Sequence, residues 1–398
     1  MKVLQLCNKP PYPPVDGGSM AMNSITQGLL AAGHEVWVLA VSSDKHPVQQ
    51  SRIDDHYLQS THFQAVHVDL AVHPLDAAVA MLCGESYHVK RYISSTFQDK
   101  LIEILDAEVF DIIHVESIFL SPYIPTIRRH SSARVVLRAH NVEHHIWRQL
   151  ARSCHNPFKA YYLRHTSLAL GAYEREHIGL YDAVLCITQS DADYFRSIGF
   201  RRPIQVIPFA VSPEPLDSVG EEAVSLFHIG SMDWRPNLEA IDWLLQKAWP
   251  KIHAAVPQAK LYLAGRNMPQ RLLSLQGDGI SVVGEVPDAL YFIASKQINI
   301  VPLQSGSGIR VKIIEAMSAG KTVIATSVAA QGIRYTDGVD ILIANSPDEF
   351  AMQVKRCADD PDFCRQIGRN AYRLVLSDYD ASVLSRRLID FYELLLEQ

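Results

Sequence analysis

Residues 298–317 read INIVPLQSGSGIRVKIIEAM, and three features follow one another in this stretch. The apolar run at 298–303 predicts a buried strand, the Gly/Ser-rich middle predicts a loop, and the last six residues have the apolar spacing of a short helix, which Gly320 ends. Glycine and serine before a helix leave backbone N–H groups available to an anion, and Arg310 and Lys312 add positive charge. The stretch predicts a βα unit that binds phosphate, although glycine loops at helix starts also arise from packing alone.

Strand and helix patterns alternate in the same way along the whole chain. Several apolar runs are nearly continuous, as is typical of parallel strands covered on both faces. Helical spacing between the runs is clearest at 236–256. Alternation on this scale predicts βαβ units and parallel sheets. The expected strands are 3–7, 35–41, 65–70, 111–115, 134–139, 183–188, 204–207, 225–229, 260–264, 280–284, 298–303, 322–326 and 340–343.

Two such series are separated by a Pro- and acid-rich segment, SPEPLD at 212–217, which is typical of a linker. We therefore expect an α/β protein of two doubly wound, Rossmann-like domains that face each other across a cleft. The first domain spans 1–212 and the second 213–378. The last helix, within 379–398, is compatible with packing on either domain, including back onto the first.

Composition narrows the class of protein. The chain has 398 residues with 37 Lys and Arg against 43 Asp and Glu, and a net charge of −6 gives no reason to expect a nucleic-acid partner. Its 6 cysteines form no CxxC pair, which favours a reducing compartment over a disulfide scaffold or a zinc site. The start, MKVLQLCNK, is too short an apolar run for a signal peptide, and no stretch approaches the roughly 20 apolar residues of a membrane span. We expect a cytoplasmic enzyme.

The longer stretch 306–326, GSGIRVKIIEAMSAGKTVIAT, resembles the donor motif of GT-B glycosyltransferases of family 4, the group 1 transferases. Five other segments resemble parts of the same family, so the resemblance spans nearly the whole chain. Residues 11–18 resemble the glycine loop after the first strand, and 138–143 the segment of the active-site histidine. Residues 227–237 resemble the opening of the second domain, and 263–265 and 283–287 the two strand ends near the nucleotide base.

This resemblance implies a retaining transfer of a sugar from a nucleoside-diphosphate donor, without a metal or another cofactor. Basic side chains and helix dipoles would stabilise the diphosphate leaving group. The pattern is closest to a bacterial subgroup that builds surface or secreted polysaccharides, which implies a glycan or lipid-linked acceptor. The implied site residues are His140, Gly17 and Gly18 at the transfer point; Arg235, Gly306, Ser307, Gly308, Ile309, Arg310, Lys312 and Glu315 around the donor, with Glu315 on the ribose; and Gly265, Arg266, Glu285 and Val286 around the base.

Two positions depart from the family's pattern. Ser307 stands where the family places the first of two glutamates, eight positions before Glu315, and this leaves the donor sugar open. The loop 230–237 has Arg235 as its only basic residue, where the family tends to carry an arginine and then a lysine. Two alternatives therefore stay open: a nucleotide-sugar epimerase on the same architecture, and a catalytically weak, transferase-like binding subunit.

Charge is distributed unevenly in the first domain. From 117 to 173 the only acidic residue is Glu143, and aromatic residues lie among the basic ones. This pattern predicts a surface for an anionic partner, either a lipid-linked pyrophosphate or the inner face of a membrane, and it fits a solvated helix face equally well. His140, His144 and His145 lack the HExxH order, so we expect no metal there. The basic residues are Arg128, Arg129, Arg134, Arg138, Arg148, Arg152, Lys159 and Arg164.

Overall fold

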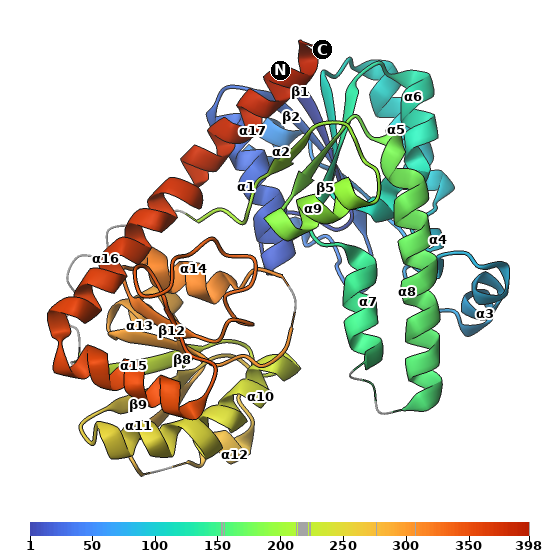
Figure 1. The fold of residues 1–398 in the computed structure, drawn as a ribbon. Helices are drawn as coiled ribbons and strands as arrows, with labels where there is room; N and C mark the ends of the chain where they lie inside the picture. The colour runs from blue at the N-terminus through green and yellow to red at the C-terminus, as the bar shows by residue number, and fades with distance from the viewer. Residues whose placement is uncertain are drawn as a thin grey trace. The chain divides into compact units, whose positions relative to one another are not determined.

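The computed structural model describes residues 1–152, 154, 156–211, 213, 222, 224–275, 277–306 and 308–397. The chain divides into two compact units, Met1–Pro208 with Leu384–Gln398, and Phe209–Val383 (Figure 1). Apart from Pro213, the expected linker lies outside the described residues. Within the described part of the chain, no helix combines the length and the apolar character that crossing a membrane requires.

The first unit is built on a seven-stranded parallel sheet in the order β3-β2-β1-β4-β5-β6-β7. The strand order reverses between β1 and β4, which are hydrogen-bonded neighbours with Leu6 opposite Val115. The strands are β1 (Lys2–Cys7), β2 (Glu35–Ser42), β3 (Gln64–His67), β4 (Ile112–Val115), β5 (Arg134–Ala139), β6 (Ala183–Cys186) and β7 (Ile204–Val206).

The helices of the first unit cover both faces of this sheet or extend beyond it (Figure 1). They are α1 (Gly17–Ala31), α2 (Asp55–Thr61), α3 (Pro74–Cys83), α4 (Tyr87–Lys90), α5 (Ser95–Ala107), α6 (Ile124–His130), α7 (Glu143–Arg152), α8 (Pro157–His177), α9 (Gln189–Ser197) and α17 (Ala381–Leu396).

The two faces of the first sheet differ in polarity. Because side chains alternate along a strand, Leu6, Val115 and Leu137 point to one face, where they join an apolar core with α5 and α9. The alternate positions, among them Gln5 and His114, point to the face where α1 and α17 pack: Gln5 Nε2 donates to the carbonyl oxygen of a residue in α1, and His114 contacts a tyrosine of α17. The second face is therefore polar as well as buried.

The second unit has a six-stranded parallel sheet in the order β10-β9-β8-β11-β12-β13. Its order reverses between β8 and β11. The strands are β8 (Ser225–Ile229), β9 (Lys260–Ala264), β10 (Ile280–Gly284), β11 (Ile298–Val301), β12 (Thr322–Ala325) and β13 (Leu342–Ile343). The helices are α10 (Arg235–Trp243), α11 (Trp249–Ala255), α12 (Gln270–Leu273), α13 (Ala289–Ala294), α14 (Val311–Ser318), α15 (Pro347–Asp359) and α16 (Pro361–Asp378).

Each expected strand is present, although several end one to three residues earlier than predicted. The helix expected at 236–256 is interrupted instead of regular. A π-helical turn, Leu244–Ala248, separates α10 from α11. Pro250 in the first turn of α11 has no N–H to continue the helical ladder, which accounts for a local change of hydrogen bonding at this point.

Candidate functional site

The strand orders select the loops at which ligands bind. In open parallel sheets, ligands lie beyond the carboxyl ends of the strands where the strand order reverses. In the second unit these ends are those of β8 and β11, which lead to Gly230 and to the loop 302–310 before α14. In the first unit they are those of β1 and β4, which lead to the loop 8–16 and to Glu116. The glycine-rich loop predicted from the sequence thus lies at the reversal point of the second sheet.

Lys312, in the first turn of α14, is held by two residues from other elements. Its Nζ donates to Asn237 Oδ1 at 2.7 Å and lies 3.3 Å from His228 Nε2. His228 is buried on β8, and its Nδ1 donates to the carbonyl oxygen of Ile300 at 2.8 Å, which leaves Nε2 as the acceptor that faces the lysine. Asn237 is itself fixed, since its Nδ2 donates to the carbonyl oxygen of Ser231 at 2.8 Å.

Burial destabilises the positive charges of this cluster. Burial, and secondly the charge of Arg310, lowers the pKa of Lys312 to about 7. Arg310 is 4 % exposed, and burial lowers its pKa to about 10. Burial and then Lys312 hold the pKa of His228 well below its usual value. An anion bound between these groups would stabilise each protonated form, so the cluster has the electrostatics of an anion site.

Two glycines beside Lys312 lie where a side chain would collide with neighbouring atoms. Gly265 has φ +144°, and a Cβ there would lie 1.8 Å from the carbonyl oxygen of Gly230. A Cβ at Gly230 would lie 2.5 Å from Lys312 Nζ. Neither a side chain at 265 nor one at 230 fits without displacing a neighbour. The sequence motif therefore has a steric reason at both positions.

Arg310, the last residue before α14, contacts its own loop and an aromatic ring. Arg310 Nη1 donates to the carbonyl oxygen of Gly308, and the guanidinium centre lies 5.5 Å from the centroid of the Trp234 ring. Gly306 has φ +115°, and a Cβ there would lie 3.1 Å from that ring and 3.0 Å from Arg310 Nη2. Ile309 packs half-buried against the core, and Ser307 lies outside the described residues.

Glu315 follows Lys312 by about one helical turn and is half-buried. Burial raises the pKa of its carboxyl group, and the charge of Lys312 opposes this. Arg235, which we grouped with the diphosphate cations, begins α10 with its side chain 68 % exposed. Its Nε donates to Glu239 Oε1 at 2.6 Å, so its partner differs from those of Lys312.

The residues expected around the base lie at two neighbouring strand ends. Gly265 follows β9, and its N–H donates to the carbonyl oxygen of Gly284, the last residue of β10, at 2.7 Å. Arg266 and Glu285, the next residues on each strand, are exposed, while Val286 is half-buried against the core. The structure therefore places this predicted group together on one edge of the second sheet.

In the first unit, Gly17 and Gly18 form the first turn of α1. Asp16 caps the helix by accepting from the N–H of Ser19 at 2.9 Å, and Lys9 Nζ donates to both Asp16 oxygens at 2.6 and 2.7 Å. Burial opposes the charge of Asp16, but the bonds from Lys9 and Ser19 lower its pKa to about 2. A Cβ at Gly18 would lie 2.8 Å from Lys9 Nζ, so a larger residue there would displace the end of the lysine side chain.

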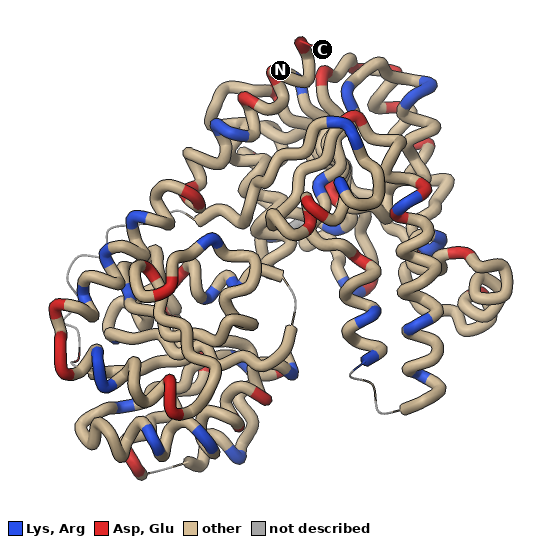
Figure 2. Tube along the Cα trace, in the orientation of Figure 1, with Lys and Arg blue, Asp and Glu red and all other residues tan. Residues whose placement is uncertain are grey.

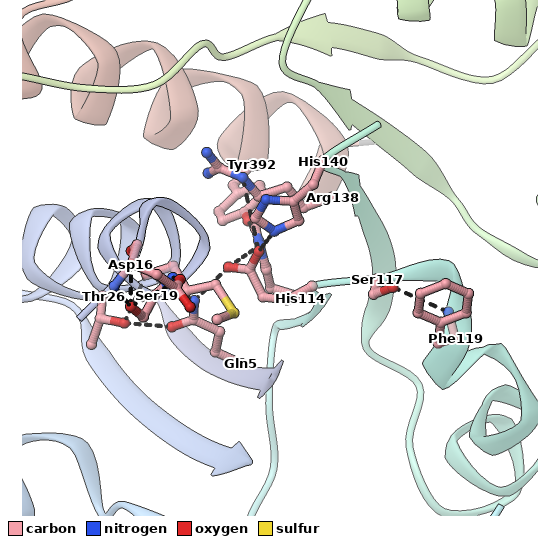
Figure 3. Close-up of polar contacts among 12 residues, drawn as sticks. Gln5, Asp16, Ser19, Thr26, His114, Ser117, Phe119, Arg138, His140 and Tyr392 are labelled. Atoms are coloured by element: carbon pink, nitrogen blue, oxygen red, sulfur yellow. Dashed lines mark hydrogen bonds and ion pairs between the residues drawn. The ribbon is translucent and has the colours of Figure 1, made fainter. Parts of the chain in front are cut away.

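His140 follows β5 and contacts a carboxylate that the sequence did not reveal as a site residue. Its Nε2 lies 2.8 Å from Oε2 of Glu116, the residue after β4. Glu116 is fully buried, and His114 and Arg138 also lie beside it (Figure 3). Sequence reasoning likewise missed the roles of His228 and Asn237. Glu116 and His228 share one signal, a polar residue inside or directly after an apolar strand pattern, which is too frequent to select them. Asn237 lies in α10, where a polar residue carries no signal of its own.

Among the described residues, no group of three or more His, Cys, Asp and Glu side chains is arranged to hold a metal. His144 belongs to another contact, since its Nδ1 hydrogen-bonds the buried carboxylate of Glu174.

Comparisons with known proteins assign the family. Residues 15–215 match the family described as Glycosyltransferase Family 4, and residues 223–360 match Glycosyl transferases group 1. A Klebsiella pneumoniae protein described as an uncharacterized 44.6 kDa protein in the cps region is 22 % identical over 406 residues, which cover 96 % of this chain and 97 % of that protein.

Two solved structures share the fold over nearly the full length. Sucrose-phosphate synthase from Thermosynechococcus elongatus is 16 % identical with a TM-score of 0.66, and the match covers 100 % of both chains. Anabaena HepE in complex with UDP is 13 % identical with a TM-score of 0.66 over 99 % of this chain and 100 % of that one. The first family match alone spans half of the chain, and both units are parallel α/β domains. The chain therefore belongs to glycosyltransferase family 4 among the group 1 glycosyltransferases, and it has their GT-B fold of two Rossmann-like domains.

Proposed function

We propose that this glycosyltransferase is a retaining, metal-independent enzyme that moves a sugar from a nucleoside-diphosphate donor to a glycan or lipid-linked acceptor. The observation that carries the proposal is a pair of cations at the N-terminus of α14, the buried Arg310 and the half-buried Lys312. Their charges are destabilised by burial, and they lie where the strand order of the second sheet reverses. A diphosphate supplies the negative charge that this position favours.

The second unit would bind the donor. The diphosphate would accept hydrogen bonds from the N–H groups of Gly306–Gly308 and the start of α14, and from Arg310 and Lys312. These groups favour negative charge as it develops on the leaving diphosphate, which lowers the barrier to cleavage of the glycosidic bond. Glu315 would accept hydrogen bonds from the ribose hydroxyls. The ends of β9 and β10 would surround the base.

The first unit would present the acceptor to the sugar. In a retaining transfer the acceptor arrives on the face from which the diphosphate leaves, so little room exists for a separate base. We assign His140 the role of positioning a hydroxyl of the transferred sugar, with the N-terminus of α1 at Gly17 and Gly18 beside it. Positioning of this kind is worth several kcal/mol, since misplacement by about 1 Å costs about a hundredfold in rate.

A role in bacterial surface or secreted polysaccharide synthesis is supported by the relative in the cps region. UDP-sugars are the first donors to test, because HepE is described in complex with UDP.

One variant separates catalysis from structure at His140. His140→Ala should lose far more transfer rate than donor affinity, because the second unit supplies most nucleotide contacts. Donor affinity, melting temperature and transfer rate are measured on the same preparation, and product anomers are assigned by NMR. A lowered melting temperature with near-normal turnover in the folded fraction would show that His140 is structural. Products with inverted anomeric configuration would overturn the retaining mechanism. Interconversion of donor epimers would indicate the nucleotide-sugar epimerase, and nucleotide binding without turnover would indicate the binding subunit.

The basic, aromatic segment of the first unit forms a helical hairpin, and we propose that it contacts an anionic membrane surface. α7 and α8 pack side by side and extend away from the sheet, with Lys and Arg along them (Figures 1 and 2). Phe158 and Tyr161 are 85 % and 66 % exposed near the start of α8, and Arg148, Arg152 and Lys159 are exposed beside them in sequence. Exposed aromatic rings with cations are suited to the interface of an acidic bilayer.

Vesicle binding tests this surface. The enzyme should bind vesicles that contain acidic phospholipid at low salt, with binding weakened by salt. Replacing Arg148, Arg152 and Lys159 by glutamine should weaken it further. The matched control replaces three exposed arginines of α16, Arg365, Arg369 and Arg373. Equal loss in both triple variants, or no binding by the wild type, would leave α7 and α8 as a solvated helical face.

A further inference from the structure

Glu116 is the centre of a buried polar network on the face of the first sheet that α1 and α17 cover. Figure 3 labels its neighbours Gln5, His114, Arg138 and His140. Its side chain is 0 % exposed, and both of its oxygens have partners. Oε1 accepts from Gln5 Nε2 at 2.6 Å and lies 3.0 Å from His114 Nε2. Oε2 lies 2.8 Å from His140 Nε2 and 3.8 Å from Arg138 Nε.

Residues of two helices hold the neighbours of Glu116 in place. Thr26 of α1 donates to Gln5 Oε1 at 2.6 Å, which turns the Gln5 amide so that Nε2 faces the carboxylate. On the other side, Nδ1 of His114 hydrogen-bonds the hydroxyl of Tyr392 in α17. The carboxylate is therefore held in one orientation by groups outside the transfer point.

The contact with Glu116 determines the tautomer of His140. Burial opposes ionisation of Glu116, but His114, His140 and Arg138 together hold its pKa well below the usual range. A carboxylate only accepts hydrogen bonds, so His140 Nε2 carries the hydrogen, and in the neutral ring the lone pair lies on Nδ1. The His140 side chain is 21 % exposed, so it is the member of the pair that reaches solvent.

We propose that Glu116 is a positioning residue, which fixes the ring of His140 so that Nδ1 accepts a hydrogen bond from a hydroxyl of the transferred sugar. This rests on the proposed role of His140. A buried carboxylate that sets the tautomer and orientation of a working histidine is a general device in enzymes. Here the carboxylate directly follows β4, and His140 directly follows the neighbouring β5, so the pairing of the two strands sets the distance between them.

The tautomer is directly measurable. With ¹⁵N-labelled histidine, the His140 ring signals are identified by their loss in His140→Ala. At a pH where the ring is neutral, we expect Nε2 to be protonated and Nδ1 to have the shift of an unprotonated nitrogen. An Nδ1–H tautomer would overturn the proposal, whatever the activity of any variant.

Two variants of Glu116 test its effect on transfer. Glu116→Asp keeps the negative charge for His114 and Arg138 but is one methylene shorter, so it withdraws from His140. We expect turnover to fall on the order of a hundredfold, as for a 1 Å misplacement, with donor affinity within about twofold of the wild type. Glu116→Gln should show the same split and should also lose the preference for the Nε2–H tautomer. Normal turnover in folded Glu116→Asp would contradict the proposal.

A control and a comparison keep the interpretations apart. Leu388→Ala, at a buried position of α17, should lower the melting temperature without changing turnover per folded molecule. If His140→Ala retains turnover, the role proposed for His140 fails. If His140→Ala loses turnover while both Glu116 variants retain it, only the positioning role of Glu116 fails.

Discussion

If Lys312 binds the diphosphate, as proposed, donor binding should depend on pH. Burial and Arg310 lower its pKa to about 7 in the free enzyme, and a bound diphosphate would raise it again. Between these two values the free enzyme carries the neutral amine and the complex carries the ammonium group. Each binding event then takes up a proton, and donor affinity falls about tenfold per pH unit as the pH rises. Calorimetry in two buffers with different heats of ionisation measures the proton uptake.

The matched pair for this prediction is Lys312→Met and Lys251→Met. Lys251 is exposed and bonded to Asp348, so its variant should retain both affinity and proton uptake. Lys312→Met should bind the donor weakly and take up no proton. A wild-type affinity that is constant from about pH 7 to 9 would contradict the assignment.

Glu315 should contribute to nucleotide affinity through its charge. If it accepts hydrogen bonds from the ribose, Glu315→Gln should weaken binding by about 1.5–3 kcal/mol for each bond lost. Because burial raises the pKa of this carboxyl, the wild type should approach the affinity of the variant as the pH falls through that raised value. Unchanged affinity in calorimetry would count against the register assigned to the α14 motif.

Sequence reasoning reached some residues of the site and missed others for a physical reason. The loop 304–310 could be predicted as a site from the sequence, because glycine, serine and Arg310 precede a helix that has Lys312 in its first turn. Lys312 and His228, however, are 84 positions apart, and His114 and Tyr392 are 278 apart. Only the pairing of strands and the docking of α17 bring these side chains together, so neither spacing nor composition could predict Glu116 or His228.

At the scale of elements, glycine after a strand lets the backbone of the next strand end approach closely, as at Gly265 and Gly230. Gly265→Ala should be strongly destabilising, because its φ of +144° is strained for alanine and the new Cβ would lie 1.8 Å from a carbonyl oxygen. Gly338→Ala is the matched control, with φ +75° and nothing within 4 Å of its Cβ. We expect the control to cost about 1–2 kcal/mol of unfolding free energy and Gly265→Ala distinctly more. Equal costs in denaturant unfolding would show that the close approach is unimportant.

The elements themselves could largely be predicted. Short apolar runs, most of them buried in the centre of a sheet, form strands at every expected position. The prediction of one regular helix at 236–256 was wrong, because apolar periodicity does not reveal the π-helical turn before Pro250. The apolar stripe of α17 was visible, but a stripe does not identify the sheet that it covers. In the structure its residues from Leu384 onward belong to the first unit.

For the whole molecule, the charges assigned to the diphosphate predict independence from divalent metal. Turnover should persist in excess EDTA, since in the proposed mechanism Arg310, Lys312 and the N–H groups of α14 would stabilise the leaving group. The assay compares initial rates with EDTA, Mg²⁺ and Mn²⁺. Activity abolished by EDTA and restored by either ion would show that the protein's own cations are insufficient.

The most direct measurement of the central claim, donor binding by the second unit through Lys312, is thermal unfolding with a panel of UDP-, GDP- and ADP-sugars. A ligand at about a hundred times its Kd stabilises the native state by roughly 2.7 kcal/mol, which gives a clear shift of the melting temperature. We predict that at least one of these donors shifts the wild type and Lys251→Met equally and leaves Lys312→Met unshifted at the same concentration. A panel that leaves the wild type unshifted, or shifts Lys312→Met as much as the wild type, would contradict the account.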